Sequence, residues 1–255
     1  MTSRLRYYFD LISVLTRKEL KVRYKNSLLG YIWSIANPLA FAFVYFIAFK
    51  VVMKIKMEDY SLFLIAGLFP WQWFSNSAIA STGVLLGNAS VIKKVRFPRS
   101  VIPLAMVLQD MIHFLISVPV VIFFLFLFHK TPSFAWIYGI PVLLSIQLLI
   151  TFGFSLILSS VNLFFRDIER LVLIIITLMF YFTPIIYSES MIPAKYEYMV
   201  ILNPLAFLMI SWRNLFLKGT LDAYYLVISF LYALLFFLSG CLVYKKLSYR
   251  FAEVL

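Results

Sequence analysis

Charged side chains, histidine and cysteine are all scarce in this chain of 255 residues. The single cysteine, Cys241, excludes a disulfide within the chain and a metal cluster held by several thiolates. The two histidines, His113 and His129, are too few for a histidine-based zinc site. Charged residues make up 13% of the chain, against about a quarter in a typical soluble domain. This composition argues against a water-soluble globular fold.

The sequence also lacks the short motifs of several common catalytic sites. It contains no His-Glu-x-x-His, no Gly-x-Ser-x-Gly and no Gly-x-x-x-x-Gly-Lys pattern. Because the last of these binds nucleotide phosphates in many ATPases, any ATP that powers this protein must bind another chain. We therefore expect no enzymatic activity, no metal and no cofactor in this chain.

Long apolar runs dominate the sequence, and hydrophobic residues account for 63% of it. The runs lie at about 31–53, 61–87, 104–128, 135–163, 171–187 and 223–244. A helix needs about 20 mostly apolar residues to cross the hydrocarbon core of a bilayer. We therefore predict an all-α integral membrane protein with six transmembrane helices, forming one membrane domain over residues 30–250.

The positive charge gives the orientation of these spans. The formal net charge is +12, which could suggest a nucleic-acid partner, but the charges lie at the ends of the apolar runs. Segments 1–30, 88–103, 164–170 and 245–255 hold sixteen of the 23 Lys and Arg residues. Since basic residues favour the cytoplasmic side, both termini are expected there, with no nucleic acid bound.

The first 29 residues are predicted to form an amphipathic helix at the membrane interface. Leu5, Tyr8, Ile12, Leu15 and Val22 fall on one helical face, and Arg6, Asp10, Ser13, Arg17 and Lys21 on the other. A basic leader that only fixes orientation is the alternative. Residues 1–25 have no apolar core followed by a cleavage site, so we expect no cleaved signal peptide.

Two segments between the spans have unusual compositions. The loop 88–103 combines four basic residues with apolar ones and two prolines, which suits docking into a groove on a soluble partner. An ordinary positive-inside loop remains the alternative reading. The apolar stretch 199–217 is interrupted by Asn203, Pro204 and Arg213, so we predict a re-entrant hairpin before the last span.

Polar and small residues within the spans are few. Asp110 and His113 are three residues apart on one helix face, and we expect mutual pairing or a partner contact there. Gly83 and Gly87 form a small-xxx-small pattern that would allow close helix packing.

Aromatic residues gather near the ends of the predicted spans. An aromatic belt at the membrane interface and a surface that stacks sugars are both open interpretations.

Several short motifs, in their order and spacing, make this chain resemble the permeases of type-2 ABC exporters. The resemblance is to the branch that exports O-antigen, capsule or teichoic-acid polymers, and it covers nearly the whole chain. The motifs are Leu15–Gly30, Tyr31–Trp33, Asn37-Pro38, Gly67–Trp71, Ile92–Pro98, Asn162–Ile168, Pro184–Tyr187 and Leu202–Pro204.

The resemblance implies a homodimer of this chain in the bacterial cytoplasmic membrane, joined to two copies of a separate ATPase that binds ATP and Mg²⁺. The substrate would be a polysaccharide on an undecaprenyl pyrophosphate carrier, and 189–217 would form outer gate helices. The ATPase-coupling residues would be Val91, Ile92, Lys93, Lys94, Arg96, Phe97, Pro98 and Arg99.

Two further sets of residues are hypotheses that rest on charge and position within this scheme. The first set would guide the pyrophosphate at the interface helix and consists of Arg17, Lys21, Arg23 and Lys25. The second would line a sugar channel and consists of Trp33, Trp71, Trp73, Tyr181 and Tyr187.

Two alternative functions remain open from the sequence. A related permease could export a drug or a simple lipid, and membrane lipids are expected contacts in either case. An integral membrane enzyme that processes glycolipids would need converging polar groups. The inner-side candidates for that role are Asp110, His113, Arg166, Asp167 and Glu169.

Overall fold

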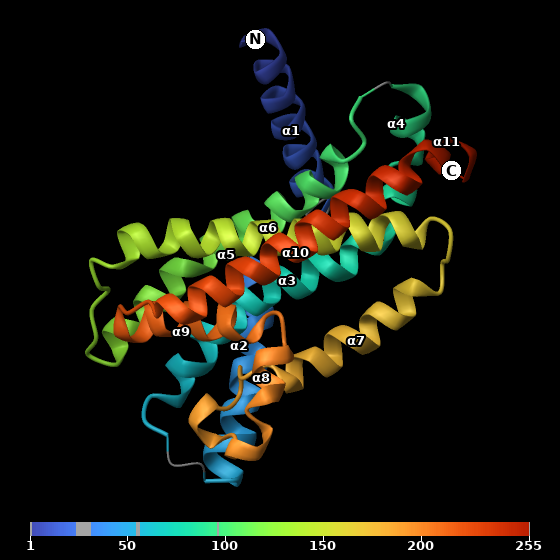
Figure 1. Cartoon of the computed structure of the whole chain (residues 1–255). Helices are drawn as coiled ribbons and strands as arrows, with labels where there is room; N and C mark the ends of the chain where they lie inside the picture. The colour runs from blue at the N-terminus through green and yellow to red at the C-terminus, as the bar shows by residue number, and fades with distance from the viewer. Residues whose placement is uncertain (1, 24–31, 55–56, 96, 255) are drawn as a thin grey trace.

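The computed structural model describes residues 2–23, 32–54, 57–95 and 97–254, and within them every regular element is helical (Figure 1). The longer helices are α1 (Thr2–Arg23), α2 (Ile32–Tyr45), α3 (Tyr60–Gly87), α5 (Val101–Leu127), α6 (Trp136–Asn162), α7 (Ile168–Phe182), α9 (Ala206–Lys218) and α10 (Ala223–Leu247). The shorter ones are η1 (Phe46–Val52, a π-helix), α4 (Ala89–Lys94), η2 (Glu189–Met191), η3 (Ala194–Tyr196), α8 (Tyr198–Leu202), η4 (Ser248–Arg250) and α11 (Phe251–Val254). The predicted all-α class is confirmed.

Four helical segments in the described ranges are long and apolar enough to cross a membrane. They are Ile35–Val52, Val101–Leu127, Trp136–Asn162 and Ala223–Arg250. The number rises to five if Ala194–Leu202 and Ala206–Lys218, which meet at a bend of 97°, form one broken span.

The other two expected spans, α3 and α7, differ from these four in composition and length. α3 has 28 residues but includes polar side chains such as Gln72 and Asn76, which lower its hydropathy. α7 has 15 residues, about 22 Å at a rise of 1.5 Å per residue. That is shorter than the hydrocarbon core, which is about 30 Å thick.

Helix α3 is the central element of the bundle and contacts α2, α5, α6, α7 and α9. It is buried without interruption from Leu62 to Trp71. Neighbouring helices surround it, so α3 tolerates polar residues that a lipid-facing helix would not. A polar side chain from a neighbouring helix also packs against α3. Gln147 of α6 is fully buried, donates a hydrogen bond to the Pro70 carbonyl at 2.7 Å and accepts one from Trp212 Nε1 at 2.5 Å. This side chain joins α3, α6 and α9.

Glycine permits the close crossing of α6 and α10. A Cβ atom added at Gly153 would lie 2.5 Å from the backbone of Phe236, and one at Gly240 would lie 2.4 Å from the Gly153 carbonyl oxygen. By contrast, a Cβ added at Gly83 or Gly87 would meet nothing within 4 Å. Within the described chain, the close packing predicted at Gly83 and Gly87 is therefore absent, and Gly153 and Gly240 take that role.

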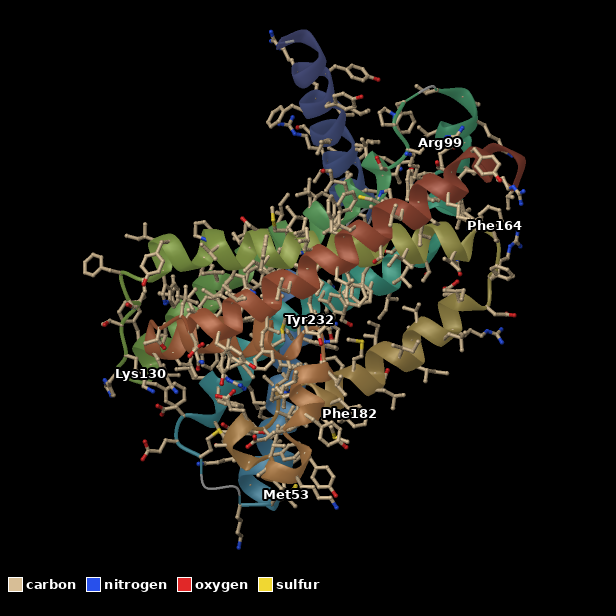
Figure 2. The ribbon with its side chains drawn as sticks, viewed as in Figure 1. Met53, Arg99, Lys130, Phe164, Phe182 and Tyr232 are labelled. Atoms are coloured by element: carbon tan, nitrogen blue, oxygen red, sulfur yellow. The ribbon has the colours of Figure 1, made fainter. Side chains whose placement is uncertain are left out.

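The 189–217 hairpin, which comprises η2, η3, α8 and most of α9, lies at the end of the bundle away from α1, α4 and the C-terminus (Figure 1). Tyr232 of α10 donates a hydrogen bond to the Ile201 carbonyl at 2.7 Å and so fastens α8 to α10 (Figure 2). Arg213 of α9 is 4% exposed, donates to the Pro184 carbonyl at 2.8 Å and lies 4.0 Å from the centre of the Phe63 ring. The hairpin is thus tied to α3, α10 and the segment after α7.

Candidate functional site

The predicted coupling loop contains the six-residue helix α4, whose two sides differ in environment. Ile92 is 4% exposed and belongs to an apolar cluster with Leu15 and Phe251, and Phe97 packs against the same cluster. Lys93 and Lys94 are exposed on the other side. Ile92 therefore anchors α4 to its own subunit, while the two lysines remain accessible to a partner.

The remaining coupling residues lie around this short helix. Arg99 Nη1 donates to the Ser248 carbonyl at 3.2 Å, which joins the loop to the end of α10 (Figure 2). Val91 and Pro98 are half-buried, and Arg96 lies outside the described residues. Val95, one of the apolar residues of this basic loop, is 53% exposed beside the two lysines and is accessible to a partner.

Helix α1 covers Thr2–Arg23 of the predicted interface helix, whose residues 1 and 24–29 lie outside the described ranges. It packs against α5, while its first turns extend away from the bundle (Figure 1). Leu15 is buried, and Leu11 and Ile12 pack against the same apolar cluster. Tyr8 and Val22, predicted on this face, are 41% and 58% exposed. The contact with the subunit is therefore confined to the middle of the helix.

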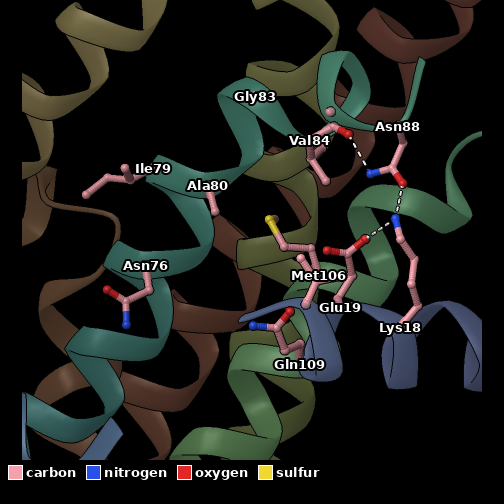
Figure 3. A pocket seen from close by; sticks show the side chains of 12 residues that line it. Lys18, Glu19, Asn76, Ile79, Ala80, Gly83, Val84, Asn88, Met106 and Gln109 are labelled. Carbon is pink, nitrogen blue, oxygen red and sulfur yellow. Dashed lines mark hydrogen bonds and ion pairs between the residues drawn. The ribbon is translucent and has the colours of Figure 1, made fainter. Parts of the chain in front are cut away.

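The junction between α1 and the α3–α4 corner is made by a pair of side chains that local sequence patterns did not reveal (Figure 3). Lys18 Nζ donates to Asn88 Oδ1 at 2.5 Å and also lies 3.0 Å from Glu19 Oε1. Asn88 Nδ2 in turn donates to the Val84 carbonyl at 2.9 Å. Asn88 immediately precedes α4, so this bond connects the predicted interface helix to the predicted coupling helix.

A cavity of about 550 Å³ opens beside this junction, between α1, α3 and α5. Its polar side chains come from all three helices, and a face of small α3 residues forms one wall (Figure 3). The lining includes Lys18, Glu19, Asn76, Ala80, Gly83, Gly87, Asn88, Met106 and Gln109. The open positions at Gly83 and Gly87 therefore contribute to a cavity.

The four basic residues predicted to guide a pyrophosphate are not gathered in this cavity. Arg17 and Lys21 are exposed on α1 and are not among the residues that line it. The side chain of Arg23 and the whole of Lys25 lie outside the described residues. The cation that does reach the cavity is Lys18, which the sequence pattern had not singled out.

The predicted channel aromatics occupy three different environments. Trp71 and Tyr181 line one cavity of about 260 Å³ between α2, α3 and α7, together with Phe41, Tyr45 and Phe180. Tyr187 donates a hydrogen bond to the Tyr181 carbonyl at 3.1 Å and lies nearby. Trp33 is 55% exposed on α2. Trp33 and Tyr181 are exposed and Tyr187 is half-buried, so these three are accessible to a ligand or a second subunit. Trp71 borders the cavity but is 3% exposed and packs in the core of the subunit.

Trp73, the fifth predicted channel aromatic, is placed inside the subunit. It is 1% exposed, stacks on Phe114 and donates from Nε1 to the Val107 carbonyl at 3.2 Å. Its neighbours come from α5 of the same chain, so the side chain holds α3 against α5. We therefore remove Trp73 from the candidate channel residues.

The polar groups that a membrane enzyme would need do not share one environment. Asp110 is 2% exposed and accepts a hydrogen bond from Ser77 Oγ at 2.9 Å, and His113 is buried one turn further on. Arg166, Asp167 and Glu169 are exposed in and beside the connection from α6 to α7. No group of three metal-binding side chains is found among the described residues. This arrangement does not favour the enzyme alternative.

Known proteins resemble this chain along nearly its whole length. The sequence pattern of the ABC-2 type transporter family matches residues 10–217. The O-antigen export system permease protein RfbA of Klebsiella pneumoniae is 50% identical over 255 residues, which are 100% of this chain and 98% of that protein. A protein of the same name from Myxococcus xanthus is 33% identical over 224 residues, 87% of this chain and 85% of that protein. The polysialic acid transport protein KpsM of Escherichia coli is 24% identical over 214 residues, 82% of this chain and 81% of its own length.

Proposed function

This chain belongs to the ABC-2 type transporter family, and we propose that it is the permease subunit of an O-antigen exporter in the bacterial inner membrane. The observation that carries the proposal is the 50% identity to an O-antigen export permease over the full chain. Its apolar helices agree with a multi-pass membrane location. The substrate is a polysaccharide held on undecaprenyl pyrophosphate, as the resemblance implies.

Energy comes from a separate ATPase, since this sequence has no phosphate-binding loop. Two copies of that ATPase would dock against α4 of two permease copies. The exposed pair Lys93 and Lys94 orients the docking, and Val95 adds apolar contact. Ile92 then transmits the movement of α4 into the cluster that also holds α1 and the C-terminal helix.

Six spans with both termini on the cytoplasmic side remain our proposed topology. In it, α2 with η1, α3, α5, α6, α7 and α10 cross the membrane, and 189–217 is re-entrant on the outer side. The position of the hairpin away from α1, α4 and the C-terminus supports this arrangement (Figure 1). Covered by protein on several sides, α3 crosses despite its polar residues.

A homodimer would complete a channel along α2 and α7, which have much large apolar surface exposed. The exposed side chains include Trp33, Phe41, Phe43, Val44, Ile174, Leu178, Tyr181 and Phe182. A second copy would cover part of this surface, since large exposed apolar patches mark interfaces or lipid contact. The aromatic cavity with Trp71 and Tyr181 would then face the polymer, because ring faces hold sugars without requiring one sequence.

The carrier would enter near the cavity between α1, α3 and α5. Lys18 offers a cation inside the cavity, while Arg17 and Lys21 offer exposed cations on the same helix. A pyrophosphate is attracted by such a cluster at the membrane interface. The apolar wall around Ala80 and Met106 would accommodate the first part of the polyprenyl chain.

The proposal is tested by deleting the gene in its host and restoring it on a plasmid. Surface O-antigen is measured by gel electrophoresis of extracted lipopolysaccharide, and lipid-linked polymer is measured in the inner membrane. We expect the deletion to remove surface polymer while lipid-linked polymer accumulates inside, and the plasmid to reverse both. Normal surface polymer in the deletion strain would contradict the proposal.

A further inference from the structure

A second polar and aromatic cavity lies at the opposite end of the bundle from α4. It has a volume of about 410 Å³ and opens between the 189–217 hairpin and the start of α10. This volume falls in the range of about 300–1,000 Å³ that is typical of small-molecule sites. The side chains that matter are Glu189, Ser190, Glu197, Phe207, Tyr224 and Tyr225. None of these side chains takes part in the proposed ATPase docking, carrier entry or α2–α7 channel.

The aromatic wall of this cavity is held in place by the cap of α10. Asp222 accepts hydrogen bonds from the backbone N–H groups of Tyr224, at 2.8 Å, and Tyr225, at 3.2 Å. The ring centre of Phe207 lies 5.9 Å from that of Tyr224 and 4.9 Å from that of Tyr225. Phe207 also belongs to an apolar cluster that joins the hairpin to α10. The rings are therefore positioned before any ligand binds.

The carboxylate of Glu189 contacts this wall. Tyr225 Oη donates to Glu189 Oε2 at 3.2 Å, which leaves the other carboxylate oxygen for a ligand. A carboxylate oxygen accepts hydrogen bonds, so it suits the hydroxyl groups of a sugar, which can donate them. Glu197 and Ser190 add polar groups at the exposed rim.

An apolar ring face beside hydrogen-bond acceptors matches the two kinds of surface on a pyranose. The ring of Tyr224 is accessible, since the residue is 58% exposed. The C–H face of a sugar can lie on this ring while its hydroxyls donate to Glu189 and Glu197. We propose that this cavity is an exit-side saccharide subsite that binds hexopyranose units of the exported polymer as they leave the membrane.

This inference rests on the proposed function, because the sugar it binds is the polymer being exported. Its location, outside the α2–α3–α7 cavity, makes it a separate site at the far end of the path. Each sugar held there disfavours backward sliding of the chain while the ATPase resets. The subsite would thus support forward movement without contacting the lipid carrier.

The test measures binding of free polysaccharide to the permease–ATPase complex in lipid nanodiscs. The probe is O-polysaccharide released by mild acid from the lipopolysaccharide of the producing strain, and the readout is saturation-transfer NMR. Tyr224→Ala and Glu189→Gln should each weaken binding about tenfold, which corresponds to about 1.4 kcal/mol. Tyr224→Phe keeps the ring and should bind as the wild type does. Tyr249→Ala is the matched control. It removes a ring that is 67% exposed just after the C-terminal end of α10, whereas Tyr224 lies at the start of α10.

The outcomes separate this inference from the proposed function when the same variants are tested for export. If the wild-type chain does not restore surface O-antigen to the deletion strain, the proposed function fails first. If the wild type restores export but Tyr224→Ala and Glu189→Gln bind polysaccharide normally, only the subsite is refuted. The subsite would also be overturned if phosphoethanolamine binds the complex and added polysaccharide does not displace it. The cavity would then hold a lipid headgroup and not a sugar.

Discussion

The bond between Lys18 and Asn88 gives the sharpest prediction about coupling, because it joins α1 to the residue that precedes α4. Lys18→Met removes the donor but keeps most of the aliphatic length of the side chain. Asn88→Ala removes both this bond and the bond from Asn88 Nδ2 to the Val84 carbonyl. Lys18→Met also removes the partly exposed ion pair to Glu19, so the bond between Lys18 and Asn88 is the one interaction that both variants lose.

The expected magnitudes follow from exposure and charge. A hydrogen bond to a charged group contributes about 1.5–3 kcal/mol when buried. The Lys18 side chain is 40% exposed, and solvent screening reduces the figure to about 0.5–1 kcal/mol. Asn88→Ala adds the loss of a neutral bond, for a total of about 1–2 kcal/mol. At 1.4 kcal/mol for each factor of ten, Lys18→Met should reduce coupling about two- to fivefold, and Asn88→Ala about five- to thirtyfold.

The assay compares polymer exported with ATP hydrolysed by the purified permease–ATPase complex in vesicles. We expect the ratio of export to hydrolysis to fall as calculated, while complex formation is unchanged. Since both variants break the same bond, the double variant should lose less coupling free energy than the sum of the two single losses. Lys246→Met, which removes another exposed lysine, is the control. Additive effects, or wild-type export by Lys18→Met, would refute the reasoning.

Three other predictions concern packing and the channel. Gln147→Leu leaves the buried indole N–H of Trp212 without its acceptor. It should lower the free energy of unfolding by about 1–3 kcal/mol, seen as a lower melting temperature by size-exclusion fluorescence. Gly153→Ala should lower the yield of folded protein because its Cβ would lie 2.5 Å from the α10 backbone. Gly83→Ala, whose Cβ would meet nothing within 4 Å, should fold with the wild-type yield. Equal yields of the two variants would contradict this. Tyr181→Ala should reduce export about two- to tenfold through lost ring stacking. Phe134→Ala removes a ring that is 89% exposed outside the cavity and should export normally.

Hydrophobic periodicity and run length predicted where the long helices lie, and the deviations at their ends have local causes. The fifth apolar run was expected to end at residue 187, but α7 ends at Phe182. Thr183 precedes Pro184 and takes an extended conformation, with ψ 133°, as residues before proline usually do. The third run was expected from residue 104, but α5 begins at Val101 and includes Pro103 in its first turn. Proline is tolerated there because a first-turn N–H needs no helical partner.

The candidate sites were less predictable because they depend on contacts between distant segments. The loop composition identified α4, but a helix of six residues is too short for its pattern to show that Ile92 faces inward. Lys18 was passed over because its importance comes from Asn88, seventy residues later. Trp73 resembled the other aromatics near span ends, and only its packing against α5 revealed a core residue.

The outer cavity shows the same limit for short-range patterns. Glu189 and Tyr225 are separated by 36 residues and come together only because the hairpin folds back on α10. The spacing of Asn203 and Pro204 did indicate an interruption, and the chain bends by 97° between α8 and α9. What fills the resulting space depends on the tertiary fold.

The most direct test of the account is charge reversal on α4. Lys93→Glu and Lys94→Glu are introduced together, and the permease is co-purified with its partner ATPase. Both ATP hydrolysis and polymer export are then measured. Because both lysines are exposed, the variant should fold and reach the membrane normally. We expect loss of the complex or of export coupled to hydrolysis. An intact complex that exports polymer at the wild-type rate would contradict the assignment of α4 as the coupling helix.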